Sequence, residues 1–200
     1  MKREITYFNL TQEKNMKTFF SLALLVSLVS LPSIAQDKVE VFGGYQYLHT
    51  GNISSDTSSS QGFNGWDASA TGYFNKYLGV TGDFGGAYAT IQGVSGHIYT
   101  YTGGPVVSFR EGKINPFVHA LFGGVRLTAS ESGVSVSRTG FTTMFGAGVD
   151  FKATKAISLR VIDVDWLYYH FGSTTIAGAG VPSVSQSNNV RITAGAVFRF

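Results

Sequence analysis

Hydrophobic and polar side chains alternate with a period of two along most of the chain after residue 37. Successive side chains of an extended strand point to opposite faces, so this alternation predicts β-strands. Eight segments show it: 38–49, 63–75, 78–90, 96–110, 117–129, 139–152, 156–171 and 188–200. The chain is therefore expected to be all-β.

The connections between these segments are alternately long and short. Polar stretches rich in Ser, Thr and Gly form the longest two, Thr50–Gly62 and Gly172–Ser187, whereas Asn75–Tyr77 and Glu111–Pro116 are brief turns. Neighbouring strands joined in this way run antiparallel, and eight of them suffice to close a small barrel. We expect a closed, eight-stranded, antiparallel up-and-down barrel.

Two strands depart from simple alternation. Pro105 lies within 96–110, and proline cannot donate a hydrogen bond to a neighbouring strand, so a bulge is expected at Gly103–Pro105. The alternation also changes phase within 156–171, and one extra residue near Ile162 would restore it as a second bulge.

Charge decides which face of the barrel meets lipid. An alternating strand in a soluble protein would turn its polar face to water, whereas a strand in a membrane barrel turns its apolar face to lipid. The apolar faces collect the aromatic side chains and lack charge, and a basic residue facing mid-bilayer lipid costs about 2–4 kcal/mol. We therefore expect a transmembrane barrel whose interior holds a salt-bridged network of charged side chains: Glu40, Asp67, Asp83, Arg126, Asp150, Arg160, Asp163, Asp165, Arg191 and Arg199.

In strand 117–129 this assignment places Phe117, Leu121 and Val125 outward and Arg126 inward. Aromatic residues are expected to form two girdles on the outer wall, as in membrane barrels. Those expected toward the long loops are Tyr45, Tyr47, Trp66, Tyr88, Tyr99, Trp166 and Tyr168, and those expected toward the short turns are Phe74, Phe109, Phe117, Phe151 and Phe200.

Residues 1–35 have the features of a cleavable signal peptide. Met16-Lys17 opens a positive region, 19–31 is an apolar run, and Pro32–Ala35 supplies small residues before the expected cleavage site. Thirteen helical residues span about 20 Å, less than the ~30 Å hydrocarbon layer, which disfavours a retained membrane helix. The barrel domain is therefore expected at 36–200, with either Met1 or Met16 as the initiator.

Composition narrows the range of functions. Residues 36–200 hold eleven Lys and Arg against ten Asp and Glu, a net charge of +1, which removes the main support for a nucleic-acid partner. The chain contains no cysteine, so disulfides and thiolate metal sites are not available. Its 25 glycines, 16 phenylalanines and 14% charged residues suit a thin-walled sheet.

Candidate chemistry is sparse. The four histidines, His49, His97, His119 and His170, have no metal-binding spacing and are expected to be isolated residues near strand ends. Gly146-x-Gly148 lacks the third glycine and the helix of a phosphate loop. No catalytic, cofactor-binding or metal site is expected.

Three segments carry a family resemblance: Gly148-Val-Asp-Phe, Leu159-Arg-Val-Ile-Asp-Val-Asp-Trp and the C-terminal 188–200. They resemble the last strands of small eight-stranded bacterial outer-membrane barrels related to the OmpA transmembrane domain and the opacity-type porins. The resemblance implies an outer-membrane location, contact with its lipid, and a C-terminal strand whose Phe198 and Phe200 are read by the barrel assembly machinery. The chain stops at Phe200, so the peptidoglycan-binding domain of full-length OmpA-type proteins is not expected.

The expected function is that of a non-enzymatic integral outer-membrane barrel, with a structural role or a surface-interaction role for its long loops. A narrow passive porin for small solutes is the main alternative. A soluble carrier of lipocalin type would need an apolar interior, whereas the charged face is expected inside. An eight-stranded lipid A deacylase would resemble this chain in size, but the spacing in His170-Phe-Gly-Ser173 does not match that enzyme's His-x-Ser pair. The sequence does not identify a partner for the loops.

Overall fold

A computed structural model describes residues 39–51, 61–91, 94–131, 134–176, 179–181 and 183–200. The predicted signal peptide, 1–35, lies outside these residues. No helix among the described residues is long and apolar enough to span a membrane. The regular structure is β throughout: β1 (Val39–Thr50), β2 (Gln61–Tyr73), β3 (Leu78–Ile91), β4 (Val94–Ser108), β5 (Ile114–Glu131), β6 (Val134–Lys152), β7 (Ile157–Phe171), β8 (Thr174–Ile176), β9 (Ala179–Val181) and β10 (Val184–Arg199).

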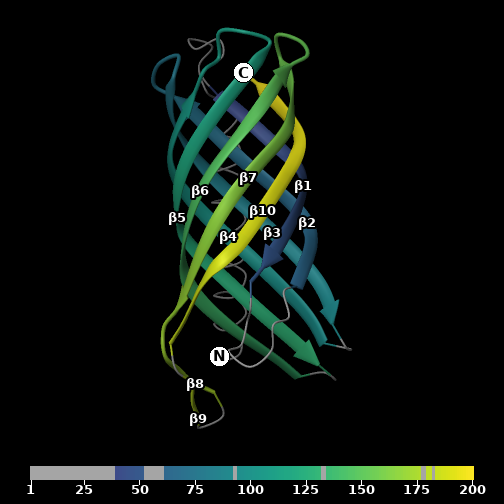
Figure 1. Cartoon of the computed structure of the whole chain (residues 1–200), viewed down its shortest axis with the longest axis vertical. Coiled ribbons are helices and arrows are strands. Elements are labelled where there is room, and N and C mark those ends of the chain that lie inside the picture. The colour runs from purple at the N-terminus through teal and green to yellow at the C-terminus, as the bar shows by residue number, and fades with distance from the viewer. Residues whose placement is uncertain (1–38, 52–60, 92–93, 132–133, 177–178, 182) are drawn as a thin grey trace, which may run out of the picture. The chain divides into compact units, whose positions relative to one another are not determined.

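Eight of these strands form a closed antiparallel barrel (Figure 1) in the order β1-β10-β7-β6-β5-β4-β3-β2. Pairing of the first and last strands closes it, with Glu40 opposite Arg199 and His49 opposite Val190. The backbones of Val39 and Phe200 exchange two hydrogen bonds, of 2.9 and 3.3 Å, at the seam. The predicted all-β, closed, eight-stranded barrel is confirmed.

The connections differ from the prediction in two places. The segment Gly172–Ser187 contains a separate two-stranded hairpin, β8–β9. Strands β5 and β6 continue to Glu131 and from Val134, so most of the expected connection 130–138 is paired strand. At the opposite end, Lys76 and Tyr77 both bond Glu111 at 2.7 Å, which joins the β2–β3 and β4–β5 turns. The hydrogen bond from Lys76, and to a smaller extent that from Tyr77, holds the pKa of the Glu111 carboxyl below its usual value.

Side chains alternate between the outer wall and the interior as predicted on seven of the barrel strands. Large apolar side chains cover the outer wall, among them Phe84 (44% exposed), Phe145 (47%) and Leu159 (51%). Polar neighbours on the same strands, such as Asp83 and Asp165, are buried. The aromatic residues predicted to form the two girdles all face the outer wall except Phe117, which is buried.

The inward and outward faces of strand β5 are the reverse of those predicted. Phe117, Leu121 and Val125 are buried inside the barrel, whereas Val118 (52%) and Phe122 (46%) are exposed on the wall. A change of one residue in phase moves every side chain of a strand to the other face.

Two charged or titratable side chains of β5 therefore also change sides. Arg126, expected inside, lies exposed on the outer wall, and His119 points inward. Arg126 pairs in register with Tyr99, a member of the loop-side girdle, where a basic residue costs only about 0–1 kcal/mol because it lies near the membrane interface. The assumption that every arginine avoids the outer wall was wrong at this depth.

Of the two predicted bulges, the one in β7 is confirmed. Val149 of β6 pairs with Ile162 and Asp150 with Arg160, so Val161 is the extra residue, and both Val161 and Ile162 are exposed.

The bulge expected in β4 is absent. Pro105 pairs with Val80 of β3 in unbroken register, and the β4–β5 ladder only omits Gly104 and Pro105 between two aligned pairs. In an antiparallel pair the N–H groups of a strand point alternately to its two neighbours. The missing N–H of proline therefore interrupts pairing on one side only and needs no inserted residue.

The loop-side half of the interior is mainly apolar, with a few buried polar side chains such as Thr142 and Asn189, and alternation alone did not predict this. A cluster of ten buried hydrophobic residues, to which seven barrel strands contribute, fills it: Leu48, Phe63, Ala87, Ile98, Leu121, Val125, Met144, Leu167, Tyr169 and Phe171. We call this cluster the apolar plug. A smaller cluster of Tyr73, Val106 and Phe117 lies toward the turns. Charged side chains occupy the level between them.

The apolar wall predicts a depth-dependent penalty for charge. Ala147 is exposed on β6, five residues before the end of the strand at Lys152, and lies in register with Val118 and Val164 on the outer wall. We expect Ala147→Arg to lower the free energy of unfolding by about 2–4 kcal/mol, because the guanidinium would face acyl chains. Urea unfolding of the refolded protein in lipid vesicles measures this. Ser137→Arg, near the loop end of the same strand, should cost about 0–1 kcal/mol, and equal penalties at both sites would contradict a lipid-facing wall.

Candidate functional site in the barrel interior

Four neighbouring strands place one residue each in a single row across the barrel interior. His119 of β5 pairs with Gly146 of β6, Gly146 with Asp165 of β7, and Asp165 with Arg191 of β10. Inward side chains at paired positions lie next to each other on one face of a sheet. The row therefore follows directly from the strand register.

Arg191 is the centre of the charged level and is only 1% exposed. Its Nε donates to Asp165 Oδ2 (2.7 Å), and its two Nη atoms donate to Asp83 Oδ1 and Oδ2 (2.9 and 3.2 Å). Nη1 also donates to Asp67 Oδ1 (3.2 Å), and Nη2 contacts the Sδ atom of Met144, a member of the apolar plug (3.1 Å). One guanidinium thus joins β2, β3, β7 and β10 across the interior.

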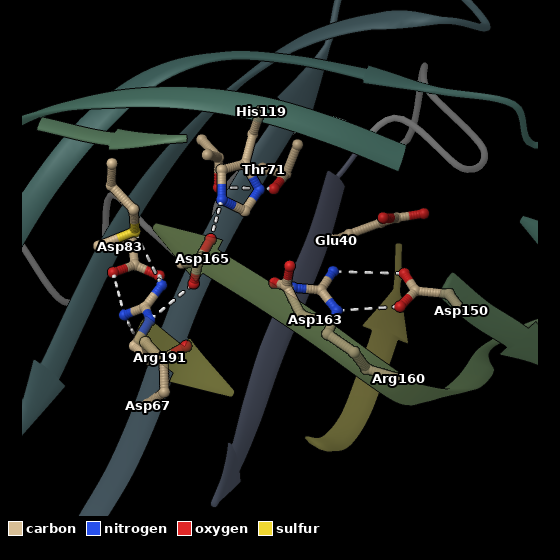
Figure 2. A network of polar contacts seen from close by, with 12 residues as sticks. Glu40, Asp67, Thr71, Asp83, His119, Asp150, Arg160, Asp163, Asp165 and Arg191 are labelled. Carbon is tan, nitrogen blue, oxygen red and sulfur yellow. Dashed lines mark hydrogen bonds and ion pairs between the residues drawn. The ribbon is translucent and has the colours of Figure 1, made fainter. Parts of the chain in front are cut away.

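Asp165 extends this group to His119 (Figure 2). The second carboxylate oxygen of Asp165, Oδ1, lies 2.6 Å from His119 Nε2. Gly146 stands between the two residues in the row, and a Cβ there would contact both Asp165 Oδ1 and His119 Nε2. Glycine is therefore required at position 146 for the two side chains to meet over its backbone.

The bulge in β7 brings a second pair together. Arg160 and Asp163 are three residues apart and would lie on opposite faces of a regular strand, but the extra residue turns both inward. Arg160 donates to both carboxylate oxygens of Asp150 (2.9 and 3.3 Å) and, more weakly, to Asp163 Oδ2 (3.4 Å). Its guanidinium also lies over the rings of two residues, Phe42 (4.5 Å) and Phe117 (4.2 Å).

Glu40 forms a third group toward the turns. Its Oε1 lies 2.9 Å from Arg199 Nε and 2.9 Å from Arg110 Nη2, and its Oε2 accepts from the Tyr73 hydroxyl (3.2 Å). The Arg199 Nε contact lacks hydrogen-bond geometry and is better described as an ion pair. Arg110 stacks on the Tyr73 ring at 4.2 Å.

The structure places nine of the ten residues of the predicted network inside the barrel, in the groups around Arg191, Arg160 and Glu40. Arg126 is the exception, because it lies on the outer wall. The fourth arginine inside the barrel is Arg110, which was not predicted there. His119 was also missed. It shares the parity of Phe117 and Leu121, so the correct phase of β5 would have identified it.

Charge is unevenly distributed among these groups. Glu40 faces two arginines, whereas Asp67, Asp83, Asp150, Asp163 and Asp165 face only Arg160 and Arg191. With every carboxyl ionised and His119 neutral, the level around Arg191 and Arg160 carries a net charge of about −3, which burial opposes strongly. His119, Asp163 and Asp165 offer one nitrogen and two oxygen atoms within 4.8 Å of one another, a set that could hold a metal ion.

The remaining predicted site residues, Phe198 and Phe200, lie at the turn end of β10. Both side chains point outward, 45% and 67% exposed. They contribute nothing to the charged level.

Comparison with known proteins identifies the architecture. A family model described as the outer membrane protein beta-barrel domain matches residues 21–200. No curated protein sequence matches the chain.

Solved structures similar to this one are small barrels. Ail, the attachment invasion locus protein of Yersinia pestis, has a TM-score of 0.55 at 20% identity, covering 83% of this chain and 100% of that one. Neisserial surface protein A has a TM-score of 0.60 at 15% identity, covering 81% and 97%. The N-terminal β-barrel domain of Pseudomonas aeruginosa OprF has 0.52 at 14%, covering 82% and 98%. At these identities the likeness concerns the fold.

The geometry predicts that Arg191 is essential for stability. We expect Arg191→Met to lower the free energy of unfolding by about 3–5 kcal/mol, because it leaves the carboxylates of Asp67, Asp83 and Asp165 buried without their cation. Urea unfolding of the refolded protein in detergent micelles is the measurement. Arg126→Met, which removes an exposed guanidinium from the wall, is the matched control and should change stability by less than about 0.5 kcal/mol. Similar losses in the two variants would contradict the assignment of Arg191 and Arg126 to opposite faces.

Proposed function

The chain belongs to the outer membrane protein β-barrel family, and we propose that it acts as a sealed, non-enzymatic barrel that holds its long loops at the bacterial surface. The protein is an integral outer-membrane barrel with lipid around its apolar wall. We propose in addition that ions do not pass through the barrel interior and that the functional surface lies in the loops.

The apolar plug is the observation that carries this proposal. Its members come from seven strands and are packed to near-complete burial, with Leu121 and Val125 at 1% exposed and Met144 and Leu167 at 0%. On the turn side of the plug, Arg191 joins carboxylates from three strands across the interior. A hydrated ion would have to displace both layers, which argues against a permanent water path.

A narrow passive porin is the second candidate, and one observation favours it. A cavity of about 20 Å³ lies beside Arg160, Asp163 and His119. A space of this size holds about one water molecule. The cavity would support a pore only if it connected to both ends of the barrel. The apolar plug lies between the cavity and the loop end.

The loops are the proposed interaction surface. Thr50–Gly62 and Gly172–Ser187 contain no Lys or Arg, and Asp56 is their one charged residue. Ail has been crystallised with a heparin analogue, sucrose octasulfate. Two loops without basic residues do not suit a polysulfated ligand, so we propose a partner that is bound through hydroxyl and amide groups.

Conductance distinguishes the sealed barrel from the porin. We expect the refolded residues 36–200 to give no ohmic current in planar lipid bilayers and no swelling of sugar-loaded liposomes, because the plug and Arg191 close the interior. A known large porin, refolded and inserted in the same way, serves as the positive control. Reproducible single-channel steps from this protein would refute the sealed barrel and favour the porin.

We further propose that residues 1–35 are removed on export and that the C-terminal aromatic is read during assembly. The first point requires that the membrane-extracted protein have the intact mass of a chain beginning at Gln36. The second concerns Phe200, whose backbone completes the seam with Val39 while its side chain is exposed.

We expect Phe200→Ala to reduce severalfold the amount of folded barrel in the outer membrane while leaving stability in detergent nearly unchanged, because the exposed ring contributes little packing. Heat-modifiable gel migration of membrane fractions measures the folded amount. Phe74→Ala, which removes another exposed turn-side ring (75%), is the control and should assemble normally. Normal assembly of Phe200→Ala, or an equal defect in Phe74→Ala, would count against a specific terminal signal.

A further inference from the structure

We propose that His119, Asp163 and Asp165 form a binding site for one divalent transition-metal ion inside the barrel. The ligand atoms are His119 Nε2 and one carboxylate oxygen from each aspartate, all within 4.8 Å of one another. An imidazole nitrogen with two carboxylate oxygens suits zinc, and also manganese or ferrous iron. Ligand atoms around a tetrahedral zinc ion lie about 3.4 Å apart. His119 Nε2 and Asp165 Oδ1, which are 2.6 Å apart, would therefore have to separate slightly, and the remaining ligand atoms would have to close by at most about 1.4 Å.

Asp163 gives a second and independent reason to expect a cation here. The residue is 2% exposed, and its Oδ1 has no hydrogen-bond partner in the part of the chain that the structure describes. Its other oxygen has only the 3.4 Å contact with Arg160, whose stronger bonds go to Asp150. A buried carboxylate oxygen without a partner is costly, and a cation beside it removes that cost.

Two of the three ligands border a cavity. This cavity of about 20 Å³ is lined by His119, Asp163 and Thr71, although not by Asp165, and it is large enough for one ion or one water molecule. Gly146 allows two of the ligands to approach each other, because a Cβ there would occupy the point where the His119 and Asp165 side chains meet. Figure 2 shows both aspartates on the same stretch of β7, with Asp165 turned toward His119.

The two nearby guanidinium groups are already paired and do not balance all the carboxylates, so a further cation is favoured at this point. Arg160 is occupied by Asp150, and Arg191 is occupied by Asp83, Asp67 and the second oxygen of Asp165. With every carboxyl ionised and His119 neutral, five aspartates against two arginines would leave about three negative charges at this level, and a divalent ion would lower the magnitude of that net charge to about one. The site lies in the wall-enclosed interior, away from the loops, and does not depend on whether the barrel conducts.

Zinc binding by the folded protein tests the proposal. Tag-free residues 36–200, refolded in metal-free detergent buffer, would be titrated with Zn²⁺ in competition with a chromophoric chelator. We expect one ion per barrel, with affinity at least tenfold weaker in Asp163→Asn and in His119→Gln. His170→Gln, which removes an exposed outer-wall histidine, should leave the affinity unchanged. Each variant must first show heat-modifiable migration, so that loss of binding is not loss of fold.

X-ray absorption on the zinc-loaded wild-type protein gives a second readout that needs no variant. We expect one nitrogen and at least two oxygen ligands at about 2.0–2.2 Å. Absence of stoichiometric binding would overturn the proposal and leave protons to balance the buried aspartates. Binding that survives Asp163→Asn and His119→Gln but is lost in His170→Gln, or a spectrum with several imidazoles, would place the ion on the outer surface and overturn it equally.

Discussion

The burial of Arg191 among carboxylates is the interaction on which the rest of this structure depends. A guanidinium that is 1% exposed inside a barrel of eight strands is tolerable only because Asp67, Asp83 and Asp165 meet its nitrogen atoms at 2.7–3.2 Å. Those four residues come from four strands, so their pairing fixes which side of each strand faces inward. Because side chains alternate, the same choice places Phe84, Val164 and Phe198 on the outer wall. The lipid-facing surface and the charged interior are thus two consequences of one arrangement.

Alternation along the sequence was sufficient to predict the architecture and most of the charged residues of the interior. The closing strand β10 shows why: Arg191 and Arg199 share one face while Ile192, Phe198 and Phe200 share the other, and no other secondary structure produces that pattern. The bulge near Ile162 could be predicted because two clear alternating patterns meet there out of phase. Arg160 and Asp163 were identified as interior residues on the same basis, although their contact requires the bulge.

The failures have equally specific causes. On β5 both faces carry large apolar residues, because the inner face contributes Leu121 and Val125 to the apolar plug while the outer face carries Val118 and Phe122. Alternation with a period of two then does not show which face is inward. Arg126, the one charged residue between positions 117 and 129, was misleading because it lies near the interface and not at the bilayer centre. His119 was lost with it. The row of His119, Gly146, Asp165 and Arg191 depends on register between strands, which no property of a single strand reveals. Pro105 was handled as a bulge because its one-sided effect on pairing depends on which neighbour its nitrogen faces.

Accessibility along β5 distinguishes a lipid-facing apolar wall from the opposite arrangement, because large apolar side chains lie on both faces of this strand. Spin labels would be placed one at a time at positions 117 to 122 of the protein in lipid bilayers, and their collision rates with lipid-soluble oxygen measured. The account predicts high oxygen accessibility at Val118, Ala120 and Phe122 and low accessibility at Phe117, His119 and Leu121. High accessibility at the second set, or no alternation, would contradict an apolar wall in lipid around an enclosed charged interior.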